Sequence, residues 1–194
     1  MLKNIVFDMG NVIIEWNPGN LSKKIAGDLS WVLEKYLFET PVWVKLDAGS
    51  VSLKEGLEEI LSYTPTEYHE LVTHAFYHWG EYITIFENTE ALIKKLKEKG
   101  YRVFMLSNCS VSFDDYHTLY PVFSEFESRY VSAHHQLMKP HKEIYLNFLE
   151  ENGLVAKECL FIDDVQKNVL GARSVGMQAY HFTGDTSELE EMLL

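Results

Sequence analysis

The sequence predicts an α/β protein built on a parallel sheet, with a purely helical segment inserted into it. Three observations lead to this prediction. Short apolar runs recur without polar alternation, which is typical of strands covered on both faces. Helical stretches separate several of these runs, as in proteins whose parallel strands are joined by helices. No convincing strand interrupts the chain from about residue 17 to residue 82.

Five apolar runs predict the strands, and the helices between them have recognisable ends. The runs are NIVF (4–7), YRVFMLS (101–107), YVSA (130–133), CLFID (159–163) and MQAYHF (177–182). The stretch NTEALIKKLKEKG ends in lysines and at Gly100, which is typical of a helix C-terminus. The stretch EIYLNFLEENG ends at Gly153. We expect right-handed crossovers between parallel strands.

The segment from residue 17 to residue 82 is predicted to be an all-helical insertion. Residues 52–55 (SLKE) have the pattern of a capping box that opens an amphipathic helix. Residues 64–67 (TPTE) have a second such pattern, with a proline at the first helical position. Its aromatic residues are expected to form the core of the helical bundle, and they include Trp31, Tyr36, Phe76 and Trp79.

The charge and composition of the chain exclude some partners. The chain has 17 Lys and Arg and 29 Asp and Glu, which gives a net charge of -12. Nucleic acid is therefore not expected to bind. An anionic small molecule stays compatible, because backbone amides and one lysine can reverse the field inside a pocket. No signal peptide or apolar stretch of membrane-spanning length is present, so no membrane partner is expected. The two cysteines, Cys109 and Cys159, show no metal-type pairing, and we expect a cytoplasmic protein.

Polar residues follow several of the predicted strands at the point where each strand ends. They are Asp8, Ser107, Asn108, Lys139, Asp163 and Asp164. In parallel α/β sheets, ligands collect beyond the carboxyl ends of the strands. The sequence therefore predicts that these separate segments meet in one crevice.

The residue types in this set favour phosphoryl transfer. Asp8, Asp163 and Asp164 would repel one another unless they share a divalent cation, and an all-oxygen set suits Mg²⁺. The hydroxyl, amide and ammonium groups of the other three residues are ligands for phosphoryl oxygens, as are the backbone amides after Asp8. Asp8 is the expected nucleophile, and the aspartyl phosphate that it forms would be hydrolysed by water.

The chain resembles the haloacid dehalogenase superfamily of hydrolases. Four motifs carry the resemblance and cover nearly the whole chain: FDMGNV, LSN, KP at Lys139 and Pro140, and FIDDVQKN. FDMGNVIIEW and the helical DAGSVSLKEGLEEIL are similar to the bacterial glucose-1-phosphate phosphatase-like branch. The resemblance implies a Rossmann-like catalytic core with strand order 3-2-1-4-5, formed by residues 1–16 and 83–194. Residues 17–82 would form an all-helical cap that controls the entry of solvent and substrate.

The resemblance also implies a role for each residue of the motifs. The expected catalytic residues are Asp8, as nucleophile, and Lys139, which would bridge the nucleophile and the phosphoryl oxygens. The expected substrate-binding residues are Gly10, Asn11, Ser107, Asn108 and Lys139. The expected Mg²⁺ ligands are Asp8, the carbonyl of Gly10, Asp163 and Asp164, and which of the last two binds directly stays open. Asn168, one helical turn after Asp164, is expected to tether the acidic loop.

Position 10 departs from the pattern of many phosphatases of this superfamily. They carry a second aspartate two residues after the nucleophile, which protonates the leaving oxygen and then activates water, whereas this chain has Gly10. Loss of a general acid commonly costs about 10²–10⁴-fold in rate when the leaving group is basic. Two hypotheses follow. The substrate needs little protonation, as with an anomeric sugar oxygen, or Glu15 or Asp47 supplies the proton.

The resemblance implies a Mg²⁺-dependent phosphomonoesterase that acts on a small sugar phosphate or similar metabolite. One alternative is a 2-haloacid dehalogenase, which also uses an aspartate nucleophile. Dehalogenases of this superfamily place an arginine in the cap and work without metal, but the first arginine here is Arg102, after the predicted cap. The other alternative is a non-catalytic sugar-phosphate-binding protein with a decayed site. Only the second acid is missing from the motifs, which favours catalysis.

Overall fold

The computed structural model describes residues 1–194 and contains one five-stranded sheet in which every neighbouring pair is parallel. The strands are β1 (Asn4–Phe7), β2 (Arg102–Ser107), β3 (Ser128–Val131), β4 (Cys159–Asp163) and β5 (Gln178–His181). Their order in the sheet is β3-β2-β1-β4-β5, which confirms the predicted α/β class and the strand order 3-2-1-4-5.

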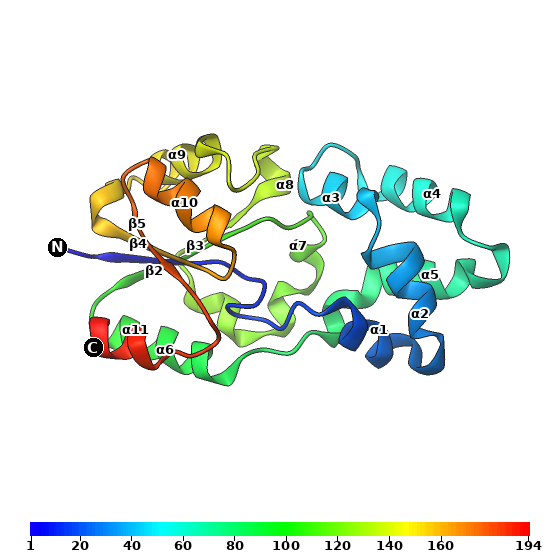
Figure 1. Ribbon diagram of the computed structural model, residues 1–194, viewed down its shortest axis with the longest axis horizontal. Helices are drawn as coiled ribbons and strands as arrows, with labels where there is room; N and C mark the ends of the chain where they lie inside the picture. Colours follow the sequence, from blue (N-terminus) through cyan, green and yellow to red (C-terminus); the bar gives the residue numbers. More distant parts are fainter.

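Helices cover both faces of the sheet, as Figure 1 shows. They are α6 (Glu87–Glu98), α9 (Lys142–Glu151), α10 (Gln166–Ser174) and α11 (Ser187–Leu193), with the short α7 (Phe113–Tyr116) and α8 (Ser132–His135) beside them. Because successive side chains of a strand point to opposite faces, Ile5 and Phe7 of β1 join one apolar cluster and Val6 joins another. This arrangement explains why the strand runs are apolar at almost every position.

One predicted strand lies two residues away from its expected position. The run YVSA predicts a strand at 130–133, but β3 ends at Val131 and Ser132 begins α8. The side chain of Ser132 explains the change of direction, because it bonds to main-chain groups outside the sheet. It accepts from the Cys109 N–H at 2.9 Å and lies 2.5 Å from the carbonyl of Asp47.

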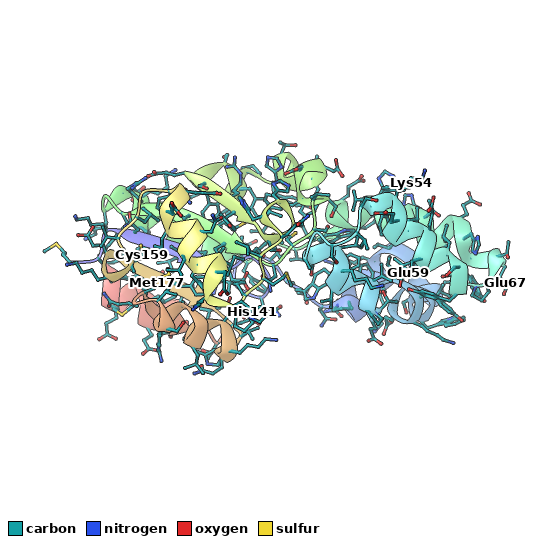
Figure 2. The ribbon with its side chains drawn as sticks, turned by 90° about the horizontal axis from the view of Figure 1, so that it is seen from above. Lys54, Glu59, Glu67, His141, Cys159 and Met177 are labelled. Carbon is teal, nitrogen blue, oxygen red and sulfur yellow. The ribbon has the colours of Figure 1, made fainter.

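The chain between β1 and α6 contains only helices and turns. The helices are α1 (Pro18–Ala26), α2 (Ser30–Leu33), α3 (Pro41–Asp47), α4 (Leu53–Tyr63) and α5 (His69–His78), and a π-helical turn over Glu34–Phe38 follows α2. They lie beside the sheet, at the end of the molecule away from both chain termini (Figure 1). Figure 2 shows the same separation from above, with Glu59 and Glu67 at one end of the molecule and Cys159 at the other. The division into a core and a cap at residues 17 and 82 stays a prediction.

The two connections between the helical segment and the sheet run alongside each other. The Phe86 N–H donates to the Ile13 carbonyl, and the Glu15 N–H donates to the Thr84 carbonyl, both at 2.9 Å. The chain therefore leaves and re-enters the sheet region at neighbouring points.

Of the two helix starts predicted in this segment, the first is confirmed and the second is wrong. The capping box is present at α4, where Ser52 Oγ accepts from the Glu55 N–H at 3.2 Å and the Glu55 side chain accepts from the Ser52 N–H at 2.8 Å. The second box is wrong, because Thr64 Oγ1 donates to the Ile60 carbonyl at 2.8 Å and so closes α4. A 3₁₀ turn follows over Thr66–Tyr68, and α5 begins only at His69.

The predicted aromatic core of this segment is partly present. Phe76 and Trp79 are buried, whereas Trp31 keeps 47% of its surface exposed and contacts Tyr68 edge to face. No helix of the structure is long and apolar enough to span a membrane.

Candidate active site

The register of the sheet places two of the predicted acids side by side. Phe7, the last residue of β1, pairs with Ile162 of β4, so the residues that follow them, Asp8 and Asp163, emerge together at the same edge. The Asp8 N–H continues the ladder by donating to the Ile162 carbonyl at 2.8 Å. Both side chains are buried, and Asp163 is fully inaccessible. Adjacent parallel strands therefore bring residues 155 positions apart into one cluster.

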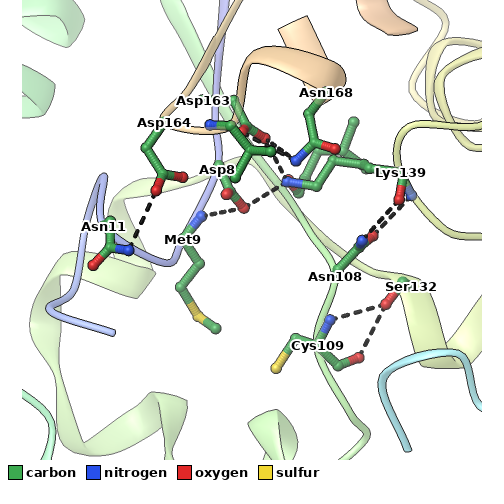
Figure 3. A network of polar contacts seen from close by, with 12 residues as sticks. Asp8, Met9, Asn11, Asn108, Cys109, Ser132, Lys139, Asp163, Asp164 and Asn168 are labelled. Carbon is green, nitrogen blue, oxygen red and sulfur yellow. Dashed lines mark hydrogen bonds and ion pairs between the residues drawn. The ribbon is translucent and has the colours of Figure 1, made fainter. Parts of the chain in front are cut away.

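Lys139 joins the two carboxylates. Its Nζ lies 2.7 Å from Asp8 Oδ1 and 2.8 Å from Asp163 Oδ2, and it donates to the Leu106 carbonyl at 3.2 Å (Figure 3). Burial opposes the charge on this lysine, but the carboxylates of Asp8 and Asp163 raise the pKa of Lys139 above its usual value. Lys139 is therefore a fixed positive charge next to the predicted nucleophile.

Asp8 is buried, and its ionisation depends on the charged groups around it. Burial raises the pKa of Asp8 to about 7, although the charge of Lys139 lowers it. The Met9 N–H donates to Asp8 Oδ1 at 2.7 Å and fixes the orientation of the carboxylate. A cation among the acidic groups would favour the ionised form that a nucleophile needs.

Asp163 is surrounded by hydrogen-bond donors. Besides Lys139, the Val165 N–H donates to its Oδ1 at 2.8 Å, and Asn168 Nδ2 donates to its Oδ1 and Oδ2 at 3.1 and 3.0 Å. Asn168 thus tethers the acidic loop as the sequence predicts (Figure 3). Both carboxylate oxygens of Asp163 are engaged in holding Lys139 and the start of α10.

Asp164 is less enclosed and has one side-chain partner. Asn11 Nδ2 donates to Asp164 Oδ2 at 3.2 Å, and burial raises the pKa of Asp164. Asn11 has a φ of 53°, in the left-handed region that Asn adopts more readily than most residues. Its Oδ1 accepts from the Trp16 N–H at 3.0 Å, so Asn11 holds the turn after β1 as well as Asp164.

The predicted phosphate-binding pair at the end of β2 has two different environments. Asn108 Nδ2 donates to the Lys139 carbonyl at 3.0 Å, and Asn108 Oδ1 accepts from the Lys139 N–H at 2.9 Å. The Asn108 side chain therefore positions the main chain of Lys139. Ser107 is buried at the carboxyl end of β2 and lines the same cavity as Asp8. A phosphate contact for either residue stays a prediction.

The predicted site residues meet at one cavity of roughly 260 Å³. Seven of them line it directly: Asp8, Gly10, Asn11, Ser107, Asn108, Lys139 and Asp164. Asp163 does not line it and contacts the cavity residues Lys139 and Asn168 from behind. Of the two proposed replacement acids, Asp47 lines the cavity, whereas Glu15 is elsewhere and accepts a hydrogen bond from Asn20 Nδ2 at 2.8 Å.

Three tryptophans form one wall of this cavity, and sequence reasoning missed their role. Trp16 stacks on Trp43 with ring centroids 5.6 Å apart, and Trp79 contacts each of them edge to face with centroids 5.5 Å away. Trp16 follows β1, while Trp43 and Trp79 come from the helical segment. No periodicity links these positions, because they converge only when the helices pack beside the sheet. Trp79 was expected in the bundle core and is in addition a wall of the site.

The donor set fits a hard divalent cation such as Mg²⁺. One carboxylate oxygen each from Asp8, Asp163 and Asp164 lie within 4.8 Å of one another. Three carboxylates with one lysine leave excess negative charge in a buried place, which a divalent cation offsets. Asn168 lines the cavity and donates its Nδ2 hydrogens to Asp163, so its amide holds one of these carboxylates in place.

Comparison with known proteins identifies the family. The family model of haloacid dehalogenase-like hydrolases matches residues 2–176, and the chain belongs to this family. The chain is 26% identical over 203 residues to a sesquiterpene phosphatase of Aspergillus oryzae, covering 98% of this chain and 94% of that protein. It is 24% identical over 206 residues to a D-ribitol-5-phosphate phosphatase of Bacteroides thetaiotaomicron, covering 93% and 91%.

A solved structure shares the whole fold. A haloacid dehalogenase family enzyme of Bacteroides thetaiotaomicron, crystallised with magnesium and inorganic phosphate, superposes with a TM-score of 0.78. It is 25% identical, and the match covers 97% of this chain and 99% of that one. The family predicted from the four motifs is confirmed, and the protein is a hydrolase of that family.

Proposed function

We propose that the protein is a Mg²⁺-dependent phosphomonoesterase that hydrolyses a small phosphorylated metabolite through an aspartyl phosphate on Asp8. The observation that carries the proposal is the convergence of Asp8, Lys139 and the acidic pair at one cavity. Two relatives named as phosphatases support it, as does the similar structure that holds magnesium and phosphate. The phosphatase class predicted from the sequence agrees with both relatives and with the similar structure.

The first half of the reaction uses the buried carboxylate as nucleophile. An oxygen of Asp8 attacks phosphorus in line with the leaving oxygen, the new O–P bond forms, and the bond to the leaving group breaks. Lys139 is paired with Asp8 and Asp163, beside the point of attack. Its ammonium group can therefore contact a phosphoryl oxygen and stabilise the negative charge of the transition state. A bound Mg²⁺ supplies charge neutralisation for the phosphoryl group and its carboxylate neighbours.

Different acids have different roles in this proposal. Asp8, the Gly10 carbonyl and Asp164 would hold the metal directly, because Asp164 has only Asn11 as a side-chain donor. Asp163 would act mainly through Lys139 and Asn168, since both of its oxygens already accept hydrogen bonds. In the second half of the reaction, water attacks phosphorus of the aspartyl phosphate and releases phosphate and the Asp8 carboxylate.

The organic part of the substrate would rest against the wall of tryptophans. Flat indole faces contact sugar rings and apolar groups equally well, and the cavity of roughly 260 Å³ is small. The two relatives are named for chemically different substrates, a sesquiterpene and a polyol phosphate. We therefore propose a small phosphorylated metabolite as substrate, and the sugar phosphate predicted from the sequence is one member of that class. Its location in the cytoplasm stays a prediction.

The positions of the arginines disfavour the dehalogenase alternative. The chain has three arginines, and each has a partner away from the cavity. Arg102 pairs with Glu127 at 2.7 Å, Arg129 donates to the Phe123 carbonyl, and Arg173 donates to the Ala179 carbonyl. None is placed to receive a halide or the carboxylate of a haloacid.

Release of inorganic phosphate from a panel of phosphorylated metabolites tests the proposal. We expect Mg²⁺-dependent turnover by the natural protein and no turnover by Asp8→Asn. Asp185→Asn is the matched control, because Asp185 is exposed and its carboxylate accepts a hydrogen bond from the Ser187 N–H. This variant should keep full activity. Turnover that survives in Asp8→Asn would contradict the covalent mechanism. Tight metabolite binding without any phosphate release would support the non-catalytic alternative.

A further inference from the structure

We propose that Asp47 is the general acid and base of the reaction, in place of the acid that position 10 lacks. This inference rests on the proposed function. Asp47 is the last residue of α3, in the helical segment, and it lines the same cavity as Asp8 and Lys139. An ester of an ordinary alcohol needs a proton on its leaving oxygen, and a positioned carboxylic acid can supply it.

Of the carboxylates that line the cavity, only that of Asp47 has no role in the nucleophilic or metal-binding part of the proposal. Three of them line it: Asp8, Asp47 and Asp164. Asp8 is the nucleophile, and Asp164 belongs to the acidic cluster beside it. Asp47 is outside that cluster, next to Trp43 of the same helix. Since the tryptophan wall is where the organic part of the substrate would lie, Asp47 is on the leaving-group side of the cavity.

The main chain of Asp47 is fixed to the sheet side of the molecule. Ser132 Oγ, at the start of α8, lies 2.5 Å from the Asp47 carbonyl and 3.2 Å from the Cys109 carbonyl. Cys109 directly follows Ser107 and Asn108, and Figure 3 shows its contacts with Ser132. One hydroxyl therefore links the end of α3 to the loop after β2. A general acid needs such fixed placement relative to the reacting atoms.

Gly49, two residues after Asp47, allows the turn after α3 to approach α8 closely. Gly49 has a φ of 62°, and a Cβ at this position would overlap the carbonyl oxygen of Ala133. Gln136 Nε2 adds a hydrogen bond to the Gly49 carbonyl at 3.4 Å. The turn after α3 therefore lies directly against α8, and this contact holds the C-terminal end of α3, where Asp47 lies.

The protonation state of Asp47 suits the role. Burial raises the pKa of Asp47 to about 8, although a hydrogen bond from the Ser110 backbone lowers it. The titratable groups that interact with Asp47 are Cys109 and Tyr116, and burial raises the pKa of both, so they stay neutral. Asp47 is thus largely protonated near neutral pH and can give a proton to a leaving oxygen.

The proton balance closes over the two steps. As Asp8 attacks phosphorus, the bonding electron pair of the P–O bond moves to the leaving oxygen, which takes the proton of Asp47 and departs as an alcohol. Asp47 is then a carboxylate. When water attacks the aspartyl phosphate, Asp47 takes a proton from that water, phosphate is released, and both aspartates return to their starting states.

The test compares Asp47→Asn with the natural protein on esters of rising leaving-group basicity, in saturating Mg²⁺. The series is p-nitrophenyl, phenyl and a simple alkyl phosphate, and the quantity is kcat/KM, which reports the first chemical step. We expect a loss of a few-fold for p-nitrophenyl phosphate and about 10²–10⁴-fold for the alkyl ester. A merely structural role would lower all three rates equally, and that result would overturn the inference while the proposed function stands.

Two further variants keep the test decisive. Asp28→Asn removes an exposed aspartate of the same helical segment and should leave the whole series unchanged. Gly10→Asp in the Asp47→Asn protein should recover about tenfold or more for the alkyl ester, because a Cβ at position 10 meets only Trp16 Cβ at 3.5 Å. No recovery, together with equal losses across the series, would overturn the role of Asp47. Absence of turnover of every ester by the natural protein would overturn the proposed function itself.

Discussion

Lys139 is the residue that holds the site together. Its ammonium group is buried between Asp8 and Asp163, and its main chain is held by Asn108. Removing one partner of a buried ion pair leaves charge without compensation, which is far more costly than loss of an exposed pair.

Lys139→Met is therefore expected to lower the free energy of unfolding by about 3–5 kcal/mol without Mg²⁺, measured by urea denaturation. Lys3→Met is the matched control, because Lys3 pairs with Glu158 while 62% of its side chain is exposed. That variant should lose less than about 1 kcal/mol. Equal losses in the two variants would contradict a buried, charged Lys139.

Asp47 gives a stability prediction with a defined direction in pH. Its carboxyl ionises in the unfolded chain near pH 4, but in the folded protein its pKa is raised to about 8. Between these values the folded state holds a proton that the unfolded state has lost, so the stability contribution of Asp47 falls as pH rises.

Asp47→Asn removes this pH-dependent cost. We expect the variant to gain melting temperature relative to the natural protein, with a larger gain at about pH 7.5 than at about pH 4.5. The Lys45–Glu59 pair between α3 and α4 is unchanged in both proteins, so it cancels in the comparison. Melting curves whose difference is the same at both pH values would show that Asp47 ionises normally.

At the residue scale, the sequence was sufficient to predict that the acids and the lysine lie together, but not how each side chain is oriented. Asp8 and Asp164 could be predicted because they lie directly after strands whose carboxyl ends face the site, and Lys139 because its segment follows β3 and α8. The position of Asp163 behind Lys139, and the use of the Asn108 amide on the main chain, depend on side-chain directions within a few ångströms. Motif spacing does not encode these directions.

The contact between the turn after α3 and α8 is the feature of greatest consequence at the scale of elements. It connects the helical segment, which carries Asp47 and Trp43, to the sheet, which carries Asp8. Comparing alanine substitutions at two glycines with positive φ distinguishes the effect of this contact from the effect of backbone strain. A Cβ at Gly49 (φ 62°) would overlap Ala133, whereas a Cβ at Gly153 (φ 61°) would meet nothing within 4 Å.

Gly49→Ala is expected to destabilise the protein more than Gly153→Ala does. Both variants carry about 1–2 kcal/mol of left-handed strain, and only the first adds an overlap of about 1–3 kcal/mol. Urea denaturation measures the difference. Gly49→Ala should also lose more kcat/KM on alkyl than on p-nitrophenyl phosphate, because it displaces Asp47. Equal stability of the two variants would contradict a close contact at α8.

The elements themselves were predicted with uneven success, for physical reasons. The central strands were clear because burial on both faces leaves them apolar throughout. The helix start at residues 64–67 was wrong because Thr64 bonds backward to Ile60, a choice that the capping pattern does not distinguish. The tryptophan wall could not be predicted, because Trp16, Trp43 and Trp79 meet only through tertiary packing.

The charge of the whole molecule bears on how the site binds its metal. A net charge of -12 attracts cations generally, so weak binding of Mg²⁺ elsewhere on the surface is expected as a background. Binding at the acidic cluster is distinguished by its linkage to stability. A ligand that binds only the folded state stabilises it by about 2.7 kcal/mol at a concentration one hundred times its Kd.

Addition of Mg²⁺ is therefore expected to raise the melting temperature of the natural protein and of Asp185→Asn by the same amount. Asp164→Asn should lose most of this rise, because Asp164 is in the cluster, whereas Asp185 is exposed and outside it. Thermal scans over a series of Mg²⁺ concentrations measure the effect. An equal rise in all three proteins would place the metal outside the acidic cluster.

The stereochemical course at phosphorus tests the central claim most directly. Each in-line displacement inverts the configuration, so attack by Asp8 followed by attack by water must give overall retention. A phosphate monoester made chiral at phosphorus by oxygen isotopes and sulfur, hydrolysed in isotopically labelled water with Mg²⁺, reports this course. The account predicts thiophosphate of retained configuration. Inverted product would show that water attacks the substrate in a single step and that Asp8 is not the nucleophile.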